Sequence, residues 1–193
     1  MRTCSFTSRG KWRREVRFAP FAILFLLAGC ATSQPRRTEL VLDEFLAFAR
    51  PEICQTSPGH GAFMDAMVTF DGDAGAYPGR IAAPPALSAA FGPIHREQTD
   101  DYQIISTPVS GIWLGMRLLE ISQLFPDGGD PGDFHFVLDA PLEQVRDRLR
   151  GAGFPVSMDE AVILPNSDGY THTLTLVRSP ANPDQTIFGC GWN

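Results

Sequence analysis

The second half of the chain alternates apolar and polar residues with a period of two, which is the pattern of β-strands with one buried face. It predicts strands at residues 102–109, 112–125, 134–139, 161–164, 170–178 and 185–192. Ser110-Gly111 is the expected turn between the first two strands. The loop at residues 126–133 is rich in Pro, Gly and Asp, and its two flanking strands are expected to form a hairpin. The strand at 112–125 is apolar on both faces in its first half, so we expect it to be central.

A helical spacing of apolar residues occurs twice. Leu42, Phe45, Leu46 and Ala49 predict a helix over residues 39–50, which Pro51 would end. A second apolar stripe predicts a helix over residues 141–150.

Smaller signals complete the pattern. Asp139 is the expected N-cap of the second helix, and Gly151 follows its last turn. Residues 55–62 contain Pro58, Gly59 and Gly61 and predict a turn, and residues 63–70 predict a strand. The Pro- and Gly-rich stretch at 71–93 predicts a long connection with a short helical turn at 86–90.

The order of these elements is a helix, a strand, a long loop, a run of strands, a helix and a run of strands. Runs of strands with occasional helices favour a sheet of antiparallel strands over a parallel one. We therefore expect a single α+β domain at residues 39–193, an antiparallel β-sheet with two helices packed on one face.

The start of the chain is of a different kind. Residues 1–17 are basic, and residues 18–28 are apolar and end in small side chains, which is the pattern of an export signal. The apolar stretch is shorter than the roughly 20 residues that a membrane-spanning helix needs. Leu27-Ala28-Gly29-Cys30 resembles the lipobox of bacterial lipoproteins.

This resemblance implies that residues 1–29 are a signal peptide and that Cys30 becomes the lipidated first residue, carrying diacylglycerol and a further acyl chain such as palmitate. Residues 30–38 would then be a flexible tether, since they are polar and cannot bury a core. Ala31, in place of Asp, implies an outer-membrane anchor that faces the periplasm. Membrane lipid is the partner expected at Cys30, because several acyl chains anchor a protein stably.

Charge narrows the choice of partners. The residues after Gly29 contain ten basic and 21 acidic side chains and no lysine. We expect no nucleic-acid binding, since a phosphate backbone requires a basic face. A solvated periplasmic surface explains the acidity, and an acidic patch for a basic partner is the alternative.

The cysteines fit an exported protein. With Cys4 in the signal and Cys30 lipidated, Cys54 and Cys190 are expected to form one disulfide in an oxidising compartment. Two unrelated thiols or a redox pair are the alternatives.

The candidate chemical residues do not form a motif that we recognise. His60, His135 and His172 lack the spacing of a metal-ligand pair, although His135 and His172 could face each other across a sheet. His95 lies in a predicted loop. We expect these histidines to be structural or on the surface, and we expect no metal and no cofactor.

Acidic loops and serines add no enzyme signature. The loops at 71–73 and 127–133 lack the ligand spacing of a calcium loop and are typical of turns. No Gly-x-Ser-x-Gly motif is present, and no base lies near the candidate serines in sequence, which are Ser57, Ser106, Ser110 and Ser122.

Three hypotheses of function follow. The first is a non-enzymatic binding or accessory domain that contacts another envelope protein. The second is a periplasmic binder of small ligands beneath the 71–93 segment. The third is a small hydrolase that uses His60, His135 or His172, which requires at least two of them in one site.

Overall fold

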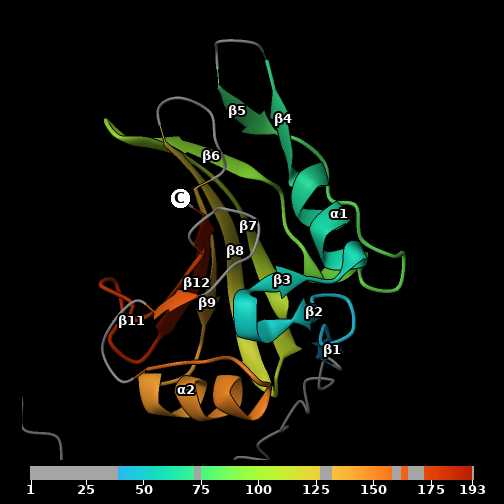
Figure 1. The fold of residues 1–193 in the computed structure, drawn as a ribbon. Coiled ribbons are helices and arrows are strands. Elements are labelled where there is room, and N and C mark those ends of the chain that lie inside the picture. The colour runs from blue at the N-terminus through green and yellow to red at the C-terminus, as the bar shows by residue number, and fades with distance from the viewer. Residues whose placement is uncertain (1–38, 72–74, 127–131, 158–161, 165–171, 193) are drawn as a thin grey trace, which may run out of the picture. The chain divides into compact units, whose positions relative to one another are not determined.

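A computed structural model describes residues 39–71, 75–126, 132–157, 162–164 and 172–192 of the chain. The signal segment, Cys30 and the tether lie outside these ranges. The main sheet has the strand order β1-β7-β8-β9-β12-β11-β10, and β6 also pairs with β7 (Figure 1). Its strands are β1 (Leu40–Val41), β6 (His95–Gln98), β7 (Tyr102–Trp113), β8 (Met116–Pro126), β9 (Asp133–Leu138), β10 (Val162–Leu164), β11 (His172–Arg178) and β12 (Thr186–Trp192).

Every pair in this sheet is antiparallel except β1 with β7. Two α-helices accompany it in the described chain, α1 (Pro58–Met67) and α2 (Leu142–Gly151). The predicted mixed α and β class with a mainly antiparallel sheet is therefore confirmed.

The long hairpin of β7 and β8 differs from the prediction in the position of its turn. Ser110 and Gly111 lie inside β7, and the turn is at Leu114-Gly115. Both turn residues have positive φ, 50° and 73°, which is the geometry of a tight hairpin turn. Glycine favours this conformation, but leucine rarely adopts it, so the pair Leu114-Gly115 is a weaker turn signal than Ser110-Gly111. The N–H of Leu114 donates to Asp43 Oδ1 at 2.6 Å, which fixes the turn from outside the hairpin.

The second half of the domain follows the prediction closely. Strand β8 lies between β7 and β9, as expected of a central strand, and β9, β11 and β12 are within two residues of their predicted bounds. Helix α2 also forms where it was predicted. Its expected cap is wrong, because the N-cap is Pro141 and no side chain caps the helix. Asp139 instead accepts from Arg117 at 2.9 Å. The predicted turn at 165–169 lies outside the described residues.

The predicted helix at 39–50 is wrong. The segment forms β1, a turn at residues 43–46, and β2 (Phe48–Arg50). The helical spacing of Leu42 and Leu46 reflects a single helix-like turn. Both side chains are fully buried, and the N–H of Leu46 donates to the carbonyl of Leu42 at 2.8 Å. A single turn places both side chains in the core. Pairing of β1 and β2 with other strands outweighs the weak tendency of a short segment to remain helical.

The predicted turn at 55–62 and strand at 63–70 are also wrong over most of their length. Helix α1 occupies Pro58–Met67, and only Val68–Phe70 is extended, as β4. The start signal was present in the sequence. Ser57 is the N-cap and accepts from the N–H of His60, and Pro58 occupies the first turn, where its missing N–H is harmless. Gly59 and Gly61 disfavour a helix, so the pattern at 55–62 predicts a turn in spite of this N-cap signal.

The 71–93 stretch is more ordered than a plain loop. Strand β5 (Ala76–Pro78) pairs with β4, and the predicted short helical turn is found as a 3-10 helix at Ser88–Ala90. Residues 72–74 lie outside the described chain.

The core is rich in aromatic rings, to which the 14 phenylalanines of the chain contribute most. Trp113 and Phe188 stack with ring centroids 5.7 Å apart, and Phe136 meets Trp113 edge-on at 5.0 Å. Phe48 and Phe154 pack against the same group, at 6.2 Å and 5.2 Å from Phe188. These contacts fasten the N-terminal segment and the segment after α2 to the sheet.

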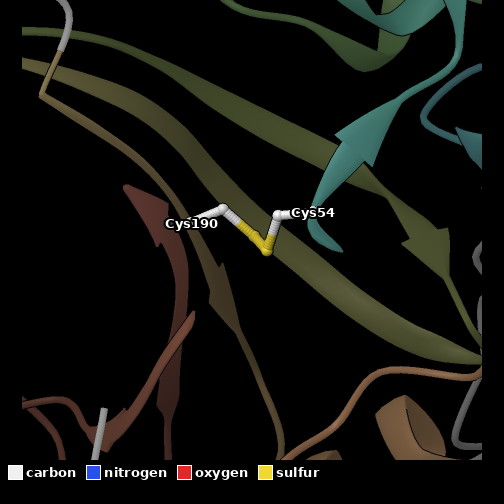
Figure 2. The surroundings of a disulfide bond; sticks show 2 residues. All are labelled: Cys54 and Cys190. Carbon is white, nitrogen blue, oxygen red and sulfur yellow. A yellow bond between two sulfur atoms is a disulfide. The ribbon is translucent and has the colours of Figure 1, made fainter. Parts of the chain in front are cut away.

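The predicted disulfide between Cys54 and Cys190 is present (Figure 2). It joins a residue that follows the short 3-10 helix Pro51–Ile53 to the middle of β12, across 136 positions of sequence. Both cysteines are buried. The bond therefore attaches the N-terminal segment to the centre of the sheet.

Candidate functional site on the polar face of the sheet

The strand registers divide the sheet into two faces. The core face carries buried side chains such as Phe134, Phe136, Phe188 and Leu174. The opposite face, here named the polar face, carries the alternate residues of each strand. They are His95, Glu97, Ile104, Ser106, Glu120, Ser122, Leu124, Asp133, His135, Val137, Thr173, Thr175, Val177, Ile187 and the glycines 189 and 191.

A row of polar residues crosses this face at right angles to the strands. His95 of β6 pairs with Ser106 of β7, which pairs with Ser122 of β8, which pairs with His135 of β9. Directly opposed residues of neighbouring strands have Cβ atoms about 5 Å apart. The two serines are therefore neighbours, and the two histidines lie at the ends of the row, about 14 Å apart across three strand spacings.

Two carboxylates flank the serines. Glu120 lies two residues before Ser122 on β8, and Glu97 lies two residues after His95 on β6. Partial burial raises the pKa of Glu120, the charge of Glu97 raises it further, and His95 acts in the opposite direction. Glu120 is therefore within electrostatic range of both Glu97 and His95.

Asp133 and His135 lie over a glycine track on β12. Gly189 pairs with His135, and Gly191 pairs with Asp133. A Cβ at Gly189 would lie 2.4 Å from His135 Cδ2, so the imidazole occupies the space that a side chain there would need. The glycines are required because these polar groups lie against the bare backbone.

This placement argues against a serine nucleophile at Ser122. The ring of His135 lies over Gly189, on the side away from Ser122, and the described chain shows no hydrogen bond between the two side chains. Burial lowers the pKa of His135, and the charge of Asp133 acts in the opposite direction. An Asp–His pair without a nucleophile in reach does not activate a hydroxyl.

His60 is a core residue and not part of the polar face. Its ring is fully buried and lies 5.1 Å from Phe48 and 5.7 Å from Phe136. Its Nδ1 lies 3.2 Å from the Ala47 carbonyl, which fixes the proton on Nδ1, and Nε2 has no partner among the described residues. Desolvation lowers the pKa of His60 to about 4, against the effect of the Ala47 contact.

The expectation that His135 and His172 could face each other is wrong. His172 is buried on the core face, in register with Trp192, whereas His135 is on the polar face, and β12 lies between their strands. The sheet therefore separates His135 from both His60 and His172. His95 is on β6 and not in a loop.

The other candidate residues fall into simple roles. Ser57 caps α1, Ser110 is exposed on β7, and Ser106 and Ser122 are on the polar face. Most of the acidic loop at 127–133 and two residues of the 71–73 loop lie outside the described ranges. Within the described residues, no group of three or more His, Cys, Asp or Glu side chains could hold a metal ion.

Sequence reasoning missed Glu97 and Glu120. The sequence predicts a loop at His95, two residues before Glu97, and Glu120 is one polar position in a largely apolar strand. Period-two alternation could have placed Glu120 and Ser122 on one face, but only the register of β6 reveals that Glu97 joins them.

The fold and this surface define a mixed α and β domain with a mainly antiparallel sheet, an internal disulfide and one polar sheet face. None of the helices among the described residues is long and apolar enough to cross a membrane. No protein-family model matches the chain, and neither a curated protein nor a solved structure shows significant similarity to it.

Proposed function

We propose that the protein is an exported lipoprotein, anchored through Cys30 to the outer membrane, whose domain binds another envelope component without catalysing a reaction. The anchor is supported by the lipobox resemblance of residues 27–30. Export is supported by the buried disulfide of Cys54 and Cys190, because such bonds persist in oxidising compartments and are rare in the cytosol.

The observation that carries the binding role is the polar face. Its serines, histidines and acids are brought together from β6, β7, β8 and β9, and the acids have no arginine or lysine partner in the described chain. Surface charges without a structural partner are available to a binding partner, where complementary charge gives specificity and rapid association.

We further propose that both helices pack on the core face and leave the polar face uncovered. His60 of α1 lies 5.7 Å from Phe136, and Gln123 Nε2 donates to the Met64 carbonyl at 2.8 Å. Phe154, just after α2, lies 5.2 Å from Phe188. All three sheet residues belong to the core face, which supports this arrangement.

The tether would keep this domain near the membrane. Glu39 is nine residues after Cys30, lies 3.7 Å from Arg117 of β8 and directly precedes β1, where the sheet begins. A fully extended tether of this length spans about 30 Å at most. The partner is therefore expected to be a membrane component or a protein held close to the membrane.

Mass spectrometry of the N-terminal peptide from the mature protein tests the anchor. We expect a chain that begins at Cys30 and carries diacylglycerol and an amide-linked acyl group. The Cys30→Ala chain is expected to keep residues 1–29 and carry no lipid. An unmodified Cys30 in the wild-type protein would contradict the proposal.

A further inference from the structure

The chain enters the domain beside the turn between β7 and β8. Glu39 lies 3.7 Å from Arg117 at the start of β8, and Asp43 Oδ1 accepts from the N–H of Leu114 in the turn at 2.6 Å. Figure 1 shows this turn and α2 at one end of the sheet and β4 and β5 at the opposite end. Because Cys30 is only nine residues before Glu39, a lipid on Cys30 holds this end, here named the tether end, nearest to the membrane.

The tether end presents apolar side chains to the outside. Val41 is 63% exposed, and Ile112, its register partner in the parallel pair of β1 with β7, is partly exposed. Leu114 is also partly exposed and has a φ of 50°, a conformation that asparagine adopts more readily than leucine. A leucine at a strained, partly exposed turn position indicates a contact outside the chain.

The tether end lacks the acidity of the rest of the protein. Residues 36–44, 117 and 139–150, which form this end or lead into it, hold six arginines and six acids. The remainder of the chain after Gly29 holds four arginines and 15 acids, so the two net charges are zero and −11. An anionic surface therefore repels most of the domain but not its tether end.

Arg148 supplies a cation at this end. It is exposed on α2, and a Cβ at Gly115 would lie 3.8 Å from its Cζ, so the guanidinium lies beside the hairpin turn. None of the ion pairs of the described chain includes Arg148. The nearby acids are engaged by other groups, since Arg117 binds Glu39 and Asp139, Arg146 binds Glu143, Arg150 binds Asp147, and Asp43 accepts from Leu114. Among the described acids of this end, only Glu44 lacks such a contact.

We propose that the tether end contacts the anionic phospholipid headgroups of the anchoring membrane, with Val41 and Leu114 at the interface and Arg148 on a phosphate. This inference rests on the anchor proposed above and specifies which end of the domain faces the membrane. Apolar side chains at the headgroup level and a neighbouring arginine bind an anionic surface through burial and charge attraction together. The planar fork of N–H donors on a guanidinium suits a phosphate group.

Fluorescence quenching measures which end faces the membrane. The mature lipidated protein is reconstituted in vesicles of phosphatidylcholine and phosphatidylglycerol in equal parts, with a quencher attached to some headgroups. A genetically encoded fluorescent residue replaces either Gln144, exposed on α2, or Gln98, exposed on β6. Gln98 pairs with Gln103, which is about 33 Å along β7 from Trp113 at the turn. We expect quenching at position 144 to be at least about threefold stronger than at position 98.

Variants of the tether end locate the contact. Leu114→Asn suits the positive φ, so we expect it to keep the melting temperature while it weakens the quenching at position 144 about twofold. Arg148→Gln, a change at an exposed position without an ion pair, is expected to weaken it about as much. Val177→Asn is the matched control, because it removes a 46% exposed apolar side chain from the polar face and is expected to leave the quenching unchanged.

The results separate the inference from the proposed anchor. Equal quenching at positions 144 and 98, or quenching that neither Leu114→Asn nor Arg148→Gln weakens, would overturn the contact. Undiminished quenching at position 144 in vesicles of phosphatidylcholine alone would overturn the anionic headgroup as its partner. A protein that floats with the vesicles but shows equal quenching keeps the anchor and loses only the inference. A protein that carries no lipid on Cys30 and does not float with the vesicles would overturn both.

Discussion

The buried ring of His60 makes stability depend on pH in a way that can be calculated. The folded protein holds the ring neutral, with a pKa of about 4, whereas an unfolded histidine has its ordinary value of 6.5. Below pH 6.5 the unfolded state therefore binds a proton that the folded state does not. The contribution of His60 to the free energy of unfolding is therefore fully present above pH 6.5 and is lost as the pH falls toward 4.

The magnitude follows from the difference between the two pKa values. At pH 5 the unfolded ring is almost fully protonated and the folded ring is almost neutral. The loss relative to pH 7.5 is then about 2 kcal/mol, at 1.36 kcal/mol for each pH unit below 6.5. Because Nε2 is buried without a partner in the described chain, protonation would create an unpaired charge among Phe48, Phe134 and Phe136.

Urea unfolding of the purified protein at pH 7.5 and pH 5 measures this loss. His60→Phe keeps an aromatic ring, although a larger one, and cannot titrate. Whatever its stability at pH 7.5, that stability is expected to fall by about 2 kcal/mol less than that of the wild type between the two pH values. His95→Asn, a change at an exposed histidine, is expected to match the wild type within about 0.5 kcal/mol. Equal losses in the wild type and His60→Phe would refute the buried neutral ring.

Three further changes test the core and the sheet. Replacing Cys54 and Cys190 together by alanine is expected to lower the free energy of unfolding by about 4–5 kcal/mol, because the bond closes a long loop, as measured by urea unfolding. Phe188→Ala is expected to lower it by about 3–5 kcal/mol through a cavity in the aromatic core, as measured by the same method. Gly189→Ala is expected to lower it by about 1–3 kcal/mol, because the new Cβ displaces the His135 ring, and NMR signals of that ring are expected to shift.

Each change has its own control. A reducing agent is expected to destabilise the wild type and leave the double alanine variant unchanged. Val177→Ala, at a 46% exposed position of the polar face, is expected to stay within about 0.5 kcal/mol of the wild type. Gly59→Ala adds a Cβ to α1 with no atom within 4 Å and is expected to stabilise the protein by up to about 1 kcal/mol. Similar losses of stability in Gly189→Ala and Gly59→Ala would contradict the claim that Gly189 is needed to make room for the His135 ring.

The second half of the domain could be predicted because its local pattern and its tertiary role agree. In β9 and β11 buried positions alternate with partly buried ones along the chain, and in α2 the apolar stripe faces the core. The first half could not be predicted because tertiary contacts decide it. Leu42 and Leu46 share a helical spacing but are held by one turn between two short strands. Leu114 adopts a positive φ that leucine rarely takes, and its N–H donates to Asp43 Oδ1 from another segment.

The candidate site was only partly accessible to sequence reasoning. The pairing of Cys54 with Cys190 followed from cysteine number and expected compartment, and it is confirmed. The polar face depends on which residues of β6, β7, β8 and β9 are opposite one another, and strand register cannot be read from one sequence. The sequence left open whether His60 is structural, on the surface or part of a hydrolase site, and only the structure shows that it is enclosed by aromatic rings.

The most direct test of the proposed role is crosslinking in living cells from a photoreactive residue placed at Val177 on the polar face. The same residue at Gln144, exposed on α2, is the control, and Cys30→Ala removes the anchor. We predict a stoichiometric envelope partner captured from position 177, little from position 144, and loss of the crosslink in Cys30→Ala. No partner at 177, or equal capture from both positions with or without Cys30, would contradict a membrane-tethered domain that binds through its polar face.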